Sequence, residues 1–544
     1  MKFIRPLFWL VALLPIAAIA YVAQFSARLP EPWFERQLIG EAATVWSWAD
    51  CLLQHEGPLH VGARALHLAA LQVPGATCAS VIWQNVLFAA LLTIALAGLM
   101  MRAVPPLRQG GPFVLAFCGL LVCSPVYGVV WLFGERAPQV LVPLLLVAAL
   151  FWLQGPGRFA GRVLLAMLMA ILAPFFHVHG VLVGLALVPA VLGAATRNGK
   201  GGGWWWAGVL LVLAAAASTY TLFYDHRVGV ESAHWLRELW SEPGQRGLAL
   251  LHATGLVWLD LLPGLDLDEQ ALGAFSWLLV LALPWLGDRS PTGRELAAPW
   301  WSCVWFGLLM IVLAGVRFEL APPHDMLREA TYGAFLLPLG AIGLLGARFG
   351  RGVLVCGAGA LAVLAVQDWK IGVEDLRLAR MRADVVEAAY ALPEIAGTAD
   401  EQRAVRNEQT QLMLQANGWI PPIDQRAASL PAAFGSPSQD RYGAVSGGTA
   451  QRVEGTLRSS LTADTVVWMF VLARDPGAAP QVVGDVRPVF AGVGRQVPWA
   501  VDLAAPIADG RKVRVVGFTP RERLWIAMGP EFDVVDGKLV PPAQ

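Results

Sequence analysis

Long apolar stretches recur along this chain from Phe8 to about Val366, far beyond the N-terminal region. A helix that crosses the hydrocarbon core of a bilayer needs about 20 mostly apolar residues, because in lipid every backbone hydrogen bond must be made internally. A cleaved signal peptide does not explain stretches that continue so far along the sequence. Hydrophobic residues make up 56% of the chain and charged residues only 15%. The sequence therefore predicts a polytopic α-helical membrane protein.

We expect about eleven membrane-spanning helices from the number of apolar stretches of sufficient length. Pro and Gly interrupt the third stretch and several later ones. No internal repeat of the transporter type relates the two halves, because their loop lengths and motifs do not correspond. The approximate centres of the expected helices are Leu14, Leu91, Gly119, Leu146, Leu168, Leu187, Leu213, Val280, Met310, Ala341 and Val363.

Basic residues in short loops indicate which end of the bundle faces the cytoplasm, because Lys and Arg are retained on that side. Lys2 and Arg5 precede the first span, and alternate loops then carry another basic pair with few acids. These pairs are Arg102 and Arg108, Arg158 and Arg162, Arg197 and Lys200, Arg289 and Arg294, and Arg348 and Arg351. The pattern predicts a cytoplasmic N-terminus and, after an odd number of crossings, a periplasmic C-terminal domain. The amphipathic stretch 247–262 is expected to lie flat on the outer surface, because counting it as a span would invert two of the pairs.

With this topology, all nine histidines fall in outer loops or at the outer ends of helices. One interpretation is that polar residues avoid spans and that the outer loops are simply longer. The other is that the polar chemistry of the protein faces the periplasm. Ionisable residues are costly to place near lipid, so the second interpretation makes an outward-facing cavity the default site.

The composition divides the chain into three parts. Residues 1–367 form the predicted transmembrane domain, with a structured first periplasmic loop at 24–80 that is too long for a simple connector. Residues 368–445 are expected to form a periplasmic helical linker, because apolar residues recur at helical spacing after Val373. Residues 446–544 predict a periplasmic β-sandwich domain, because short apolar runs alternate there with turn signals.

Five runs in the last part are the expected strands. Trp468, Trp499 and Trp525 lie in or beside them and would suit stacking on a carbohydrate, although tryptophan at alternating strand positions is more often part of a core. We therefore assign no site there. The runs are Thr465 to Leu472, Val486 to Val493, Trp499 to Leu503, Lys512 to Phe518, and Arg523 to Met528.

The first periplasmic loop begins with carboxylates just beyond the membrane, at Glu31 and Glu35, and continues to Asp50. A carboxylate here is well placed to deprotonate an incoming hydroxyl group while a lipid-linked leaving group sits in the adjacent bilayer. Glu35 is the first candidate for this general base, with Glu31 or Asp50 as the alternative. The competing interpretation is an ordinary solvated cluster at the start of a helix, with His55 as a hydrogen-bonded loop residue.

Several motifs resemble those of bacterial multi-span glycosyltransferases of the GT-C type. The first loop carries Pro32-Trp-Phe-Glu35 and Gln54-His-Glu56 followed by Arg64, where the family has an acidic Trp-containing motif and then a His-Asn-Glu-His-Arg-like segment. Further similar segments are Trp131-Leu-Phe-Gly-Glu-Arg136, His177-Val-His179-Gly and Arg328-Glu-Ala-Thr-Tyr332. The chain departs from the family in having Glu at position 35, where Asp is commoner, and Glu at position 56 in place of Asn.

The resemblance implies a GT-C-like fold, a polyprenyl-phosphate-linked sugar donor, inverting transfer and an outward-facing active site. Such chemistry needs cations that hold the departing phosphate, and Arg offers phosphate a bidentate geometry. Arg64, Arg136 and Arg328 are the candidates, and His55 and His179 would orient donor or acceptor. Arg328 has a second interpretation as an interfacial anchor or a partner of Glu329.

The sequence lacks a Walker-type loop, a Rossmann glycine fingerprint and a His-Glu-x-x-His helix, so the usual signals of nucleotide hydrolysis, dinucleotide redox and zincin chemistry are missing. We expect neither a cofactor nor a metal. Forty basic residues balance forty acidic ones, so no nucleic-acid partner is expected. Cys51 and Cys78 share the first periplasmic loop, where a disulfide between them would restrain it.

The leading hypothesis is a glycosyltransferase of the bacterial inner membrane that moves a sugar from a polyprenyl-phosphate carrier to a periplasmic glycan, lipid or protein acceptor. The first alternative is a transporter or flippase for a lipid-linked or polar substrate, which predicts charged residues deep within several spans. The second is a non-catalytic membrane scaffold whose β domain recruits partners. The second alternative would be favoured if no outward cavity were lined by Glu35 and Arg328.

Overall fold

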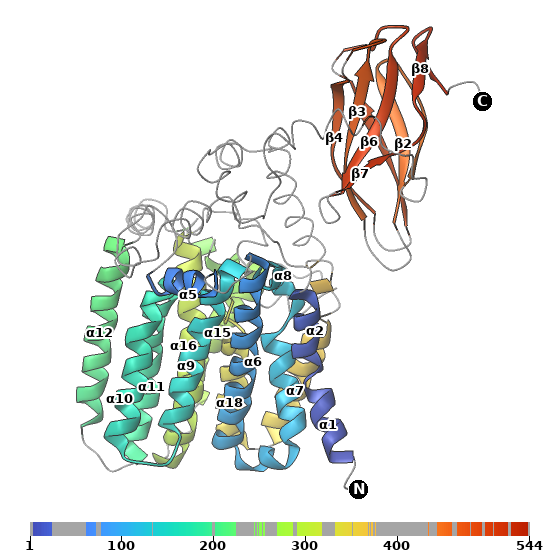
Figure 1. Ribbon diagram of the computed structural model, residues 1–544. Helices are drawn as coiled ribbons and strands as arrows, with labels where there is room; N and C mark the ends of the chain where they lie inside the picture. The colour runs from blue at the N-terminus through green and yellow to red at the C-terminus, as the bar shows by residue number, and fades with distance from the viewer. Residues whose placement is uncertain are drawn as a thin grey trace. The chain divides into compact units, whose positions relative to one another are not determined.

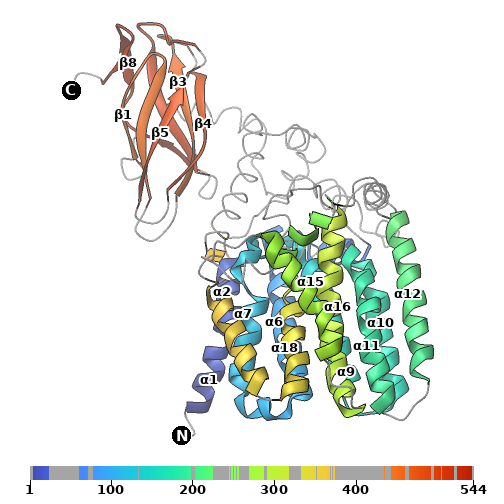
Figure 2. The ribbon, with the colours of Figure 1, turned by 180° about the vertical axis from the view of Figure 1, so that it is seen from behind.

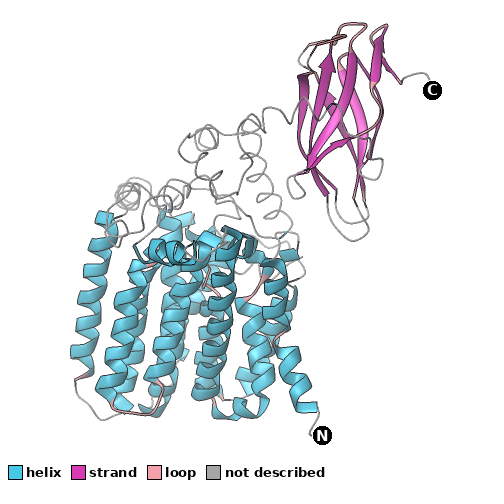
Figure 3. Ribbon diagram, in the orientation of Figure 1, coloured by secondary structure: helices cyan, strands magenta, loops and turns pink. Residues whose placement is uncertain are grey.

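The computed structural model describes two compact units, within Met1–Arg380 and Met381–Gln544. Helices gather in the first unit and strands in the second (Figure 3). The described residues are 4–23, 61–71, 78–132, 134–197, 202–224, 269–286, 291–317, 332–350, 352–367, 443–459, 465–478, 480–491, 495–503, 505–519, 524–541, and single positions within 244–255, 369–376 and at 434.

The first unit is a bundle of apolar helices (Figure 1). The described α-helices are α1 (Ile4–Ala12), α2 (Leu14–Ala23), α5 (Val61–Leu71), α6 (Cys78–Ala103), α7 (Gly111–Val122), α8 (Gly128–Leu132), α9 (Ala137–Leu153), α10 (Phe159–Leu172), α11 (Val181–Arg197), α12 (Gly203–Tyr224), α15 (Glu269–Leu286), α16 (Pro291–Arg317), α18 (Leu336–Phe349) and a helix at Gly352–Gln367. Short 3-10 turns join several of them: η1 (Pro105–Gly110), η2 (Pro125–Tyr127), η3 (Gly134–Arg136), η4 (Ala173–Phe175) and η5 (Val178–Gly180).

Each span centre predicted from the sequence falls within one of these helices. The first predicted span is broken at Leu13, between α1 and α2. Pro15 explains the break, because it has no backbone N–H to donate to the preceding turn.

Three helical segments among the described residues are long and apolar enough to cross a bilayer: Val81–Ala103, Leu107–Tyr127 and Val178–Thr196. Shorter apolar helices accompany them. The number of crossings, about eleven, stays a prediction based on helix length.

The outer surface of the bundle is apolar along the middle of its helices. Large aliphatic side chains are exposed there: Leu87, Leu91, Ile94, Leu164, Leu168, Leu211, Val212, Leu278, Leu281, Val355 and Val363. A soluble protein rarely exposes so much contiguous apolar surface. Most exposed aromatic residues lie nearer the helix ends, as they do at membrane interfaces, although Trp305 and Phe275 lie within α16 and α15. Those near the ends are Phe8, Trp9, Phe113, Trp152, Trp204, Trp205 and Phe349 at one end and Tyr21, Trp83 and Phe175 at the other. This surface is suited to lipid.

The two ends of the bundle differ in charge. Figures 1 and 2 show that the α6–α7 connection, the α9–α10 connection and the last turn of α18 lie at the end where the chain begins. These segments carry the described members of the predicted basic pairs: Arg102, Arg108, Arg158, Arg162 and Arg348. Helices α5 and α8 lie at the opposite end. These described members of the basic pairs thus lie at one end of the bundle, as the sequence predicts.

Two of these arginines close the C-terminal end of α9. Arg102 donates from Nη1 to the Phe151 carbonyl oxygen at 2.6 Å, and its guanidinium lies 3.4 Å from the centre of the Phe151 ring. Arg162, which is buried, donates from Nη1 to the carbonyl oxygens of Leu153 and Gly155 at 2.9 and 2.7 Å. The last carbonyl groups of a helix carry partial negative charge and have no partner within the helix. The basic pairs therefore also join α6, α9 and α10.

The second unit is one antiparallel sheet of nine strands: β1 (Gly443–Thr449), β2 (Arg452–Arg458), β3 (Thr465–Arg474), β4 (Gln481–Ala491), β5 (Gln496–Asp502), β6 (Lys512–Thr519), β7 (Leu524–Ala527), β8 (Phe532–Val535) and β9 (Lys538–Val540). The strand order is β4-β3-β6-β8-β9-β1-β2-β5, and β7 pairs with β6. The five predicted runs coincide with β3 to β7, although β4 begins at Gln481 rather than Val486.

The expected β-sandwich is corrected to a single barrel-like sheet. The short β8–β9 hairpin, which was not predicted, joins β6 to β1 and so connects what would otherwise be two sheets. The terminal strands β4 and β5 also meet, because a Cβ atom on Gly484 would overlap the side chain of Leu503. Trp499 is 5% exposed within the enclosed core, so the interpretation of this tryptophan as a core residue is confirmed; the side chains of Trp468 and Trp525 lie outside what the structure describes.

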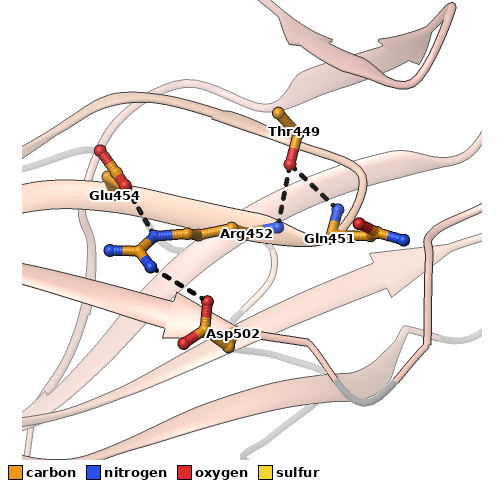
Figure 4. Close-up of polar contacts among 5 residues, drawn as sticks. All are labelled: Thr449, Gln451, Arg452, Glu454 and Asp502. Atoms are coloured by element: carbon orange, nitrogen blue, oxygen red, sulfur yellow. Dashed lines mark hydrogen bonds and ion pairs between the residues drawn. The ribbon is translucent and has the colours of Figure 1, made fainter.

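A polar cluster fixes the β1–β2 turn and the pairing of β2 with β5 (Figure 4). The Thr449 hydroxyl accepts hydrogen bonds from the backbone N–H groups of Gln451 and Arg452. Arg452 then contacts Glu454 at 2.7 Å and its cross-strand partner Asp502 at 3.4 Å. These ion pairs are half exposed, so each stabilises the sheet by only about 0.2–1 kcal/mol.

A second group of charges holds Phe434 against the outer face of the sheet. The Arg474 guanidinium lies 4.3 Å from the centre of the Phe434 ring, and Arg514 donates to the Phe434 carbonyl oxygen. Glu531 contacts Arg474 at 2.9 Å. Burial lowers the pKa of Arg514, while nearby Glu531 opposes that change.

Glycines permit the close contact between α16 and α18. A Cβ atom on Gly343 would overlap the Trp300 ring, which is buried, and one on Gly340 would lie 2.7 Å from the Trp300 carbonyl oxygen. Gly359, in the helix Gly352–Gln367, has no neighbouring atom within 4 Å of its ideal Cβ position. Gly343 and Gly359 are both helical, but only Gly343 is in close contact with another helix.

We expect Gly343→Ala to destabilise the bundle by about 1–3 kcal/mol, because the added methyl group forces α18 away from Trp300. Gly359→Ala is the matched control, and alanine's helix propensity should make it neutral or stabilising by up to about 1 kcal/mol. The measurement is the apparent melting temperature of the full-length protein in detergent. Equal melting temperatures for the two variants would contradict the packing seen between α16 and α18.

Candidate functional site

The structure describes some of the predicted site residues and not others. Glu31, Glu35, Asp50, His55 and Arg328 lie outside the described residues. The backbone of Arg64 is part of α5, but its side chain is not described. Arg136 and His179 are described fully, so the site is built from these residues and from the elements around them.

Helix α5 brings Arg64 to the turn that follows α10. Gly62, two residues before Arg64, lies so close to this turn that a Cβ atom would be 2.8 Å from the Phe175 carbonyl oxygen and 3.0 Å from the Phe176 ring. The Gln84 amide on α6 donates to the Leu66 carbonyl oxygen at 3.1 Å, which holds α5 against α6. Two contacts therefore hold α5 beside η4, just before His177.

The two histidines occupy a tight turn between α10 and α11. The ring centres of His177 and His179 are 4.4 Å apart, and Nδ1 of His177 accepts a hydrogen bond from the His179 N–H group. His179 is buried, with 3% of its surface exposed. Gly180 has no room for a side chain, because a Cβ atom there would overlap the backbone of Ala173 and Pro174. The glycine allows the turn to fold back on η4 and to place both rings there.

Arg136 is the N-cap residue of α9 and is partly buried. Its turn, η3, packs on α6, α8 and α9, and the start of α9 packs in turn on η4 and η5. The N-terminal end of a helix carries partial positive charge, which adds to that of the arginine. The elements bearing Arg64, Arg136 and His179 thus form one contiguous group at the end of the bundle that contains α5 and α8.

Three aromatic side chains donate hydrogen bonds to the carbonyl oxygens near the end of α7. Trp369 Nε1 donates to Leu120 at 2.9 Å, the Tyr332 hydroxyl to Val122 at 3.0 Å, and Trp131 Nε1 to Ser124 at 2.7 Å. The carbonyl groups at the end of a buried helix need partners from elsewhere. Residues separated by more than 200 positions in the sequence therefore meet at this helix end.

We call Tyr127, Trp131, Tyr332 and Trp369 the aromatic hub, and the rings of the first three contact one another through Tyr332. The Tyr332 ring packs edge-on against Tyr127 and Trp131, with centres 4.9 and 5.9 Å apart. Trp131 and Tyr332 are at most 1% exposed. The contacts of Tyr332 and Trp131 fix η2 and α8, which lead directly to η3 and Arg136.

Asn85 on α6 holds the same segment from the opposite side. Its amide donates from Nδ2 to the Val130 carbonyl oxygen at 2.6 Å, and the side chain is fully buried. Sequence reasoning missed the roles of Asn85 and Ser124. Trp131 and Tyr332 stand at the ends of the quoted motifs, but those motifs gave no reason to expect their hydrogen bonds to α7. The presence of a polar Asn within an apolar span was the one signal that could have identified Asn85.

The proposed cysteine pair is not tested, because Cys51 and the side chain of Cys78 lie outside what the structure describes. Among the described residues, Cys118, Cys123, Cys303 and Cys356 are free thiols. The described part of the chain contains no cluster of three or more His, Cys, Asp or Glu side chains with metal-binding geometry.

Comparison with models of protein families and with curated proteins finds no match. Two solved structures match, both of ArnT from Cupriavidus metallidurans. One, bound to undecaprenyl phosphate, is 12% identical, covers 84% of this chain and 93% of its own length, and has a TM-score of 0.39. The other, in the apo state, is 14% identical, covers 79% of this chain and 95% of its own length, and has a TM-score of 0.36.

ArnT is a GT-C glycosyltransferase, the kind of protein that the sequence motifs resemble. Because the TM-scores are below 0.5, the likeness does not by itself establish a common fold.

We expect Asn85→Leu to destabilise the protein by about 1–3 kcal/mol, because the buried Val130 carbonyl loses its donor. Thr93→Val on the same helix is the matched control: Thr93 is equally buried, but its hydroxyl bonds to the Ala89 carbonyl oxygen four residues before it. That oxygen keeps its helical partner, so the control should change little. The measurement is the apparent melting temperature in detergent. A larger loss for Thr93→Val than for Asn85→Leu would refute the assignment.

Proposed function

We propose that this protein is a membrane glycosyltransferase that moves a sugar from a polyprenyl-phosphate-linked donor to a periplasmic glycan, lipid or protein acceptor. One observation carries the proposal: the elements bearing Arg64, Arg136 and His179 are contiguous at one end of a lipid-suited bundle, and the described basic pairs lie at the other. A site on the far side from the basic end is reached from the periplasm under the rule that basic loops stay in the cytoplasm.

In the proposed reaction, the Glu35 carboxylate takes a proton from a hydroxyl group of the acceptor. The hydroxyl oxygen attacks the anomeric carbon of the sugar from the face opposite the phosphate, and the bond between that carbon and the phosphate oxygen breaks. The polyprenyl phosphate leaves with the bonding electron pair, and the configuration at the sugar inverts. Glu31 or Asp50 is the alternative base.

The departing phosphate needs positive charge beside the bilayer. Arg136, Arg64 and Arg328 are the proposed ligands, because a guanidinium group offers phosphate two parallel donors. Arg136 stands at the start of α9, where the helix dipole favours an anion. His55 and His179 are proposed to orient the donor or the acceptor.

A transporter or flippase predicts ionisable residues along a path through the bundle. Among the described residues of the bundle, the buried ionisable side chains other than Cys and Tyr are Arg162 and His179. Arg162 is engaged with the end of α9, at the end of the bundle opposite His179. This separation favours a site at one end over a path through the middle.

We expect the β unit to lie in the periplasm and η1 in the cytoplasm. Gln451→Cys in the β1–β2 turn and Gln109→Cys in η1 are a matched pair of exposed positions, to be made in a background where the six native cysteines are replaced by alanine. A membrane-impermeant maleimide applied to intact cells with a permeabilised outer membrane should label only Gln451→Cys. Both should be labelled after the inner membrane is lysed. Labelling of Gln109→Cys alone in intact cells would contradict this topology and indicate the opposite orientation.

Transfer by purified full-length protein, assayed with a panel of polyprenyl-phosphate sugars, tests the activity itself. Glu35→Gln should lower the transfer rate by about 10²–10⁴-fold, because it removes the general base but keeps the size of the side chain. Glu454→Gln, which changes an exposed carboxylate of the β unit, should leave the rate unchanged. No transfer by the wild-type protein with any donor would refute the function, whereas transfer by Glu35→Gln at the wild-type rate would refute only the base.

A further inference from the structure

The aromatic hub joins three segments that are distant in the sequence at the end of α7. Tyr332 makes the most contacts within it: its hydroxyl donates to the Val122 carbonyl oxygen at 3.0 Å, and its ring meets Tyr127, Trp131 and Phe335 edge-on. With 1% of its surface exposed, this hydroxyl has a definite partner within the bundle. A buried hydrogen bond and three ring contacts leave the side chain little freedom to move.

The contacts of Tyr332 lead directly to Arg136. Tyr127 ends η2, and Trp131 lies in α8, which is followed by η3 and its last residue, Arg136. The second hydrogen bond of the segment, from Trp131 to Ser124, closes η2 and α8 into one compact turn. Tyr332 packs on both aromatic residues of that turn, so its position determines where the turn lies against α7.

We propose that Tyr332 is a positioning residue for Arg136, which it holds through Tyr127 and Trp131 at the place where the phosphate of the lipid-linked donor binds. The inference rests on the proposed function, since it gives Arg136 the phosphate as its ligand. Tyr332 does not itself touch the donor. Loss of its hydroxyl group weakens the attachment of η2 and α8 to the end of α7. Arg136 then occupies its phosphate-binding position for a smaller fraction of the time.

Trp369 provides a matched control within the same hub. It donates to the Leu120 carbonyl oxygen, two residues before the end of α7, and the chain that follows it carries none of the proposed binding residues. Replacing Trp369 removes a hydrogen bond of the same kind from the same helix but leaves the bonds of Tyr332 and Trp131 in place. A purely structural hub predicts similar effects of the two substitutions on stability and on binding.

The test compares Tyr332→Phe with Trp369→Phe in the full-length protein, using polyprenyl phosphate as the binding probe and the polyprenyl-phosphate sugar as the substrate. Tyr332→Phe should raise the Kd for polyprenyl phosphate and the KM for the donor about three- to tenfold, as expected for the loss of one buried hydrogen bond. It should leave kcat within about twofold. Trp369→Phe should lower the melting temperature but change neither Kd nor KM.

Three outcomes decide the matter. An unchanged Kd in Tyr332→Phe, or an equal rise in Trp369→Phe, overturns the positioning role while wild-type transfer leaves the proposed function intact. Wild-type protein that neither binds polyprenyl phosphate nor transfers sugar overturns both. If Tyr332→Phe does not fold, Trp131→Phe replaces it, because loss of the Trp131 N–H bond to Ser124 releases the same turn; the rise in Kd and KM is then expected in that variant.

Discussion

The backbone carbonyl groups at the ends of buried helices are the constraint on which this bundle depends. A helix in an apolar environment leaves its last carbonyl oxygens without partners, and each unsatisfied one costs about 1–3 kcal/mol. At one end of the bundle, Arg102 and Arg162 donate to the carbonyl groups of α9. At the other end, three aromatic side chains donate to the last turn of α7 and the residue beyond it. In both cases the donors come from other elements, so satisfying one helix end also fixes its neighbours.

The choice of donor differs between the two ends for a physical reason. Arginine at the basic end places its positive charge beside the C-terminal carbonyl groups of α9, whose partial negative charge it balances. The donors at the end of α7 are buried, and a tryptophan or tyrosine there supplies a hydrogen bond without an ionic charge that would need a counter-ion. The end of α7 lies at the same end of the bundle as Arg136 and His179.

Much of the architecture was predictable from the sequence, and the exceptions have local causes. Apolar length alone located the helices, but not the break at Leu13, which depends on a single proline. The strands from β3 to β7 followed from alternation and turn signals. The β8–β9 hairpin was missed although Asp536 and Gly537, both with positive φ, are a typical two-residue turn; its strands are too short to show a period of two. Because this hairpin was missed, a β-sandwich of two sheets was expected in place of one continuous sheet.

The site was predictable only in part, because motifs mark segments and not the contacts that position them. The motif ending at Arg136 and the motif at His177 named two turns, η3 and η5, that both contact α9. Nothing in either motif indicates that Asn85, Trp131 and Tyr332 hold η2 and α8 in place. Their hydrogen bonds run to backbone carbonyl oxygens, which every residue has. The sequence therefore does not show which carbonyl oxygens accept these hydrogen bonds. A group that binds a lipid phosphate must nevertheless keep its position while the carrier enters and leaves the bilayer, and backbone acceptors on a rigid helix provide that reference more reliably than another side chain would.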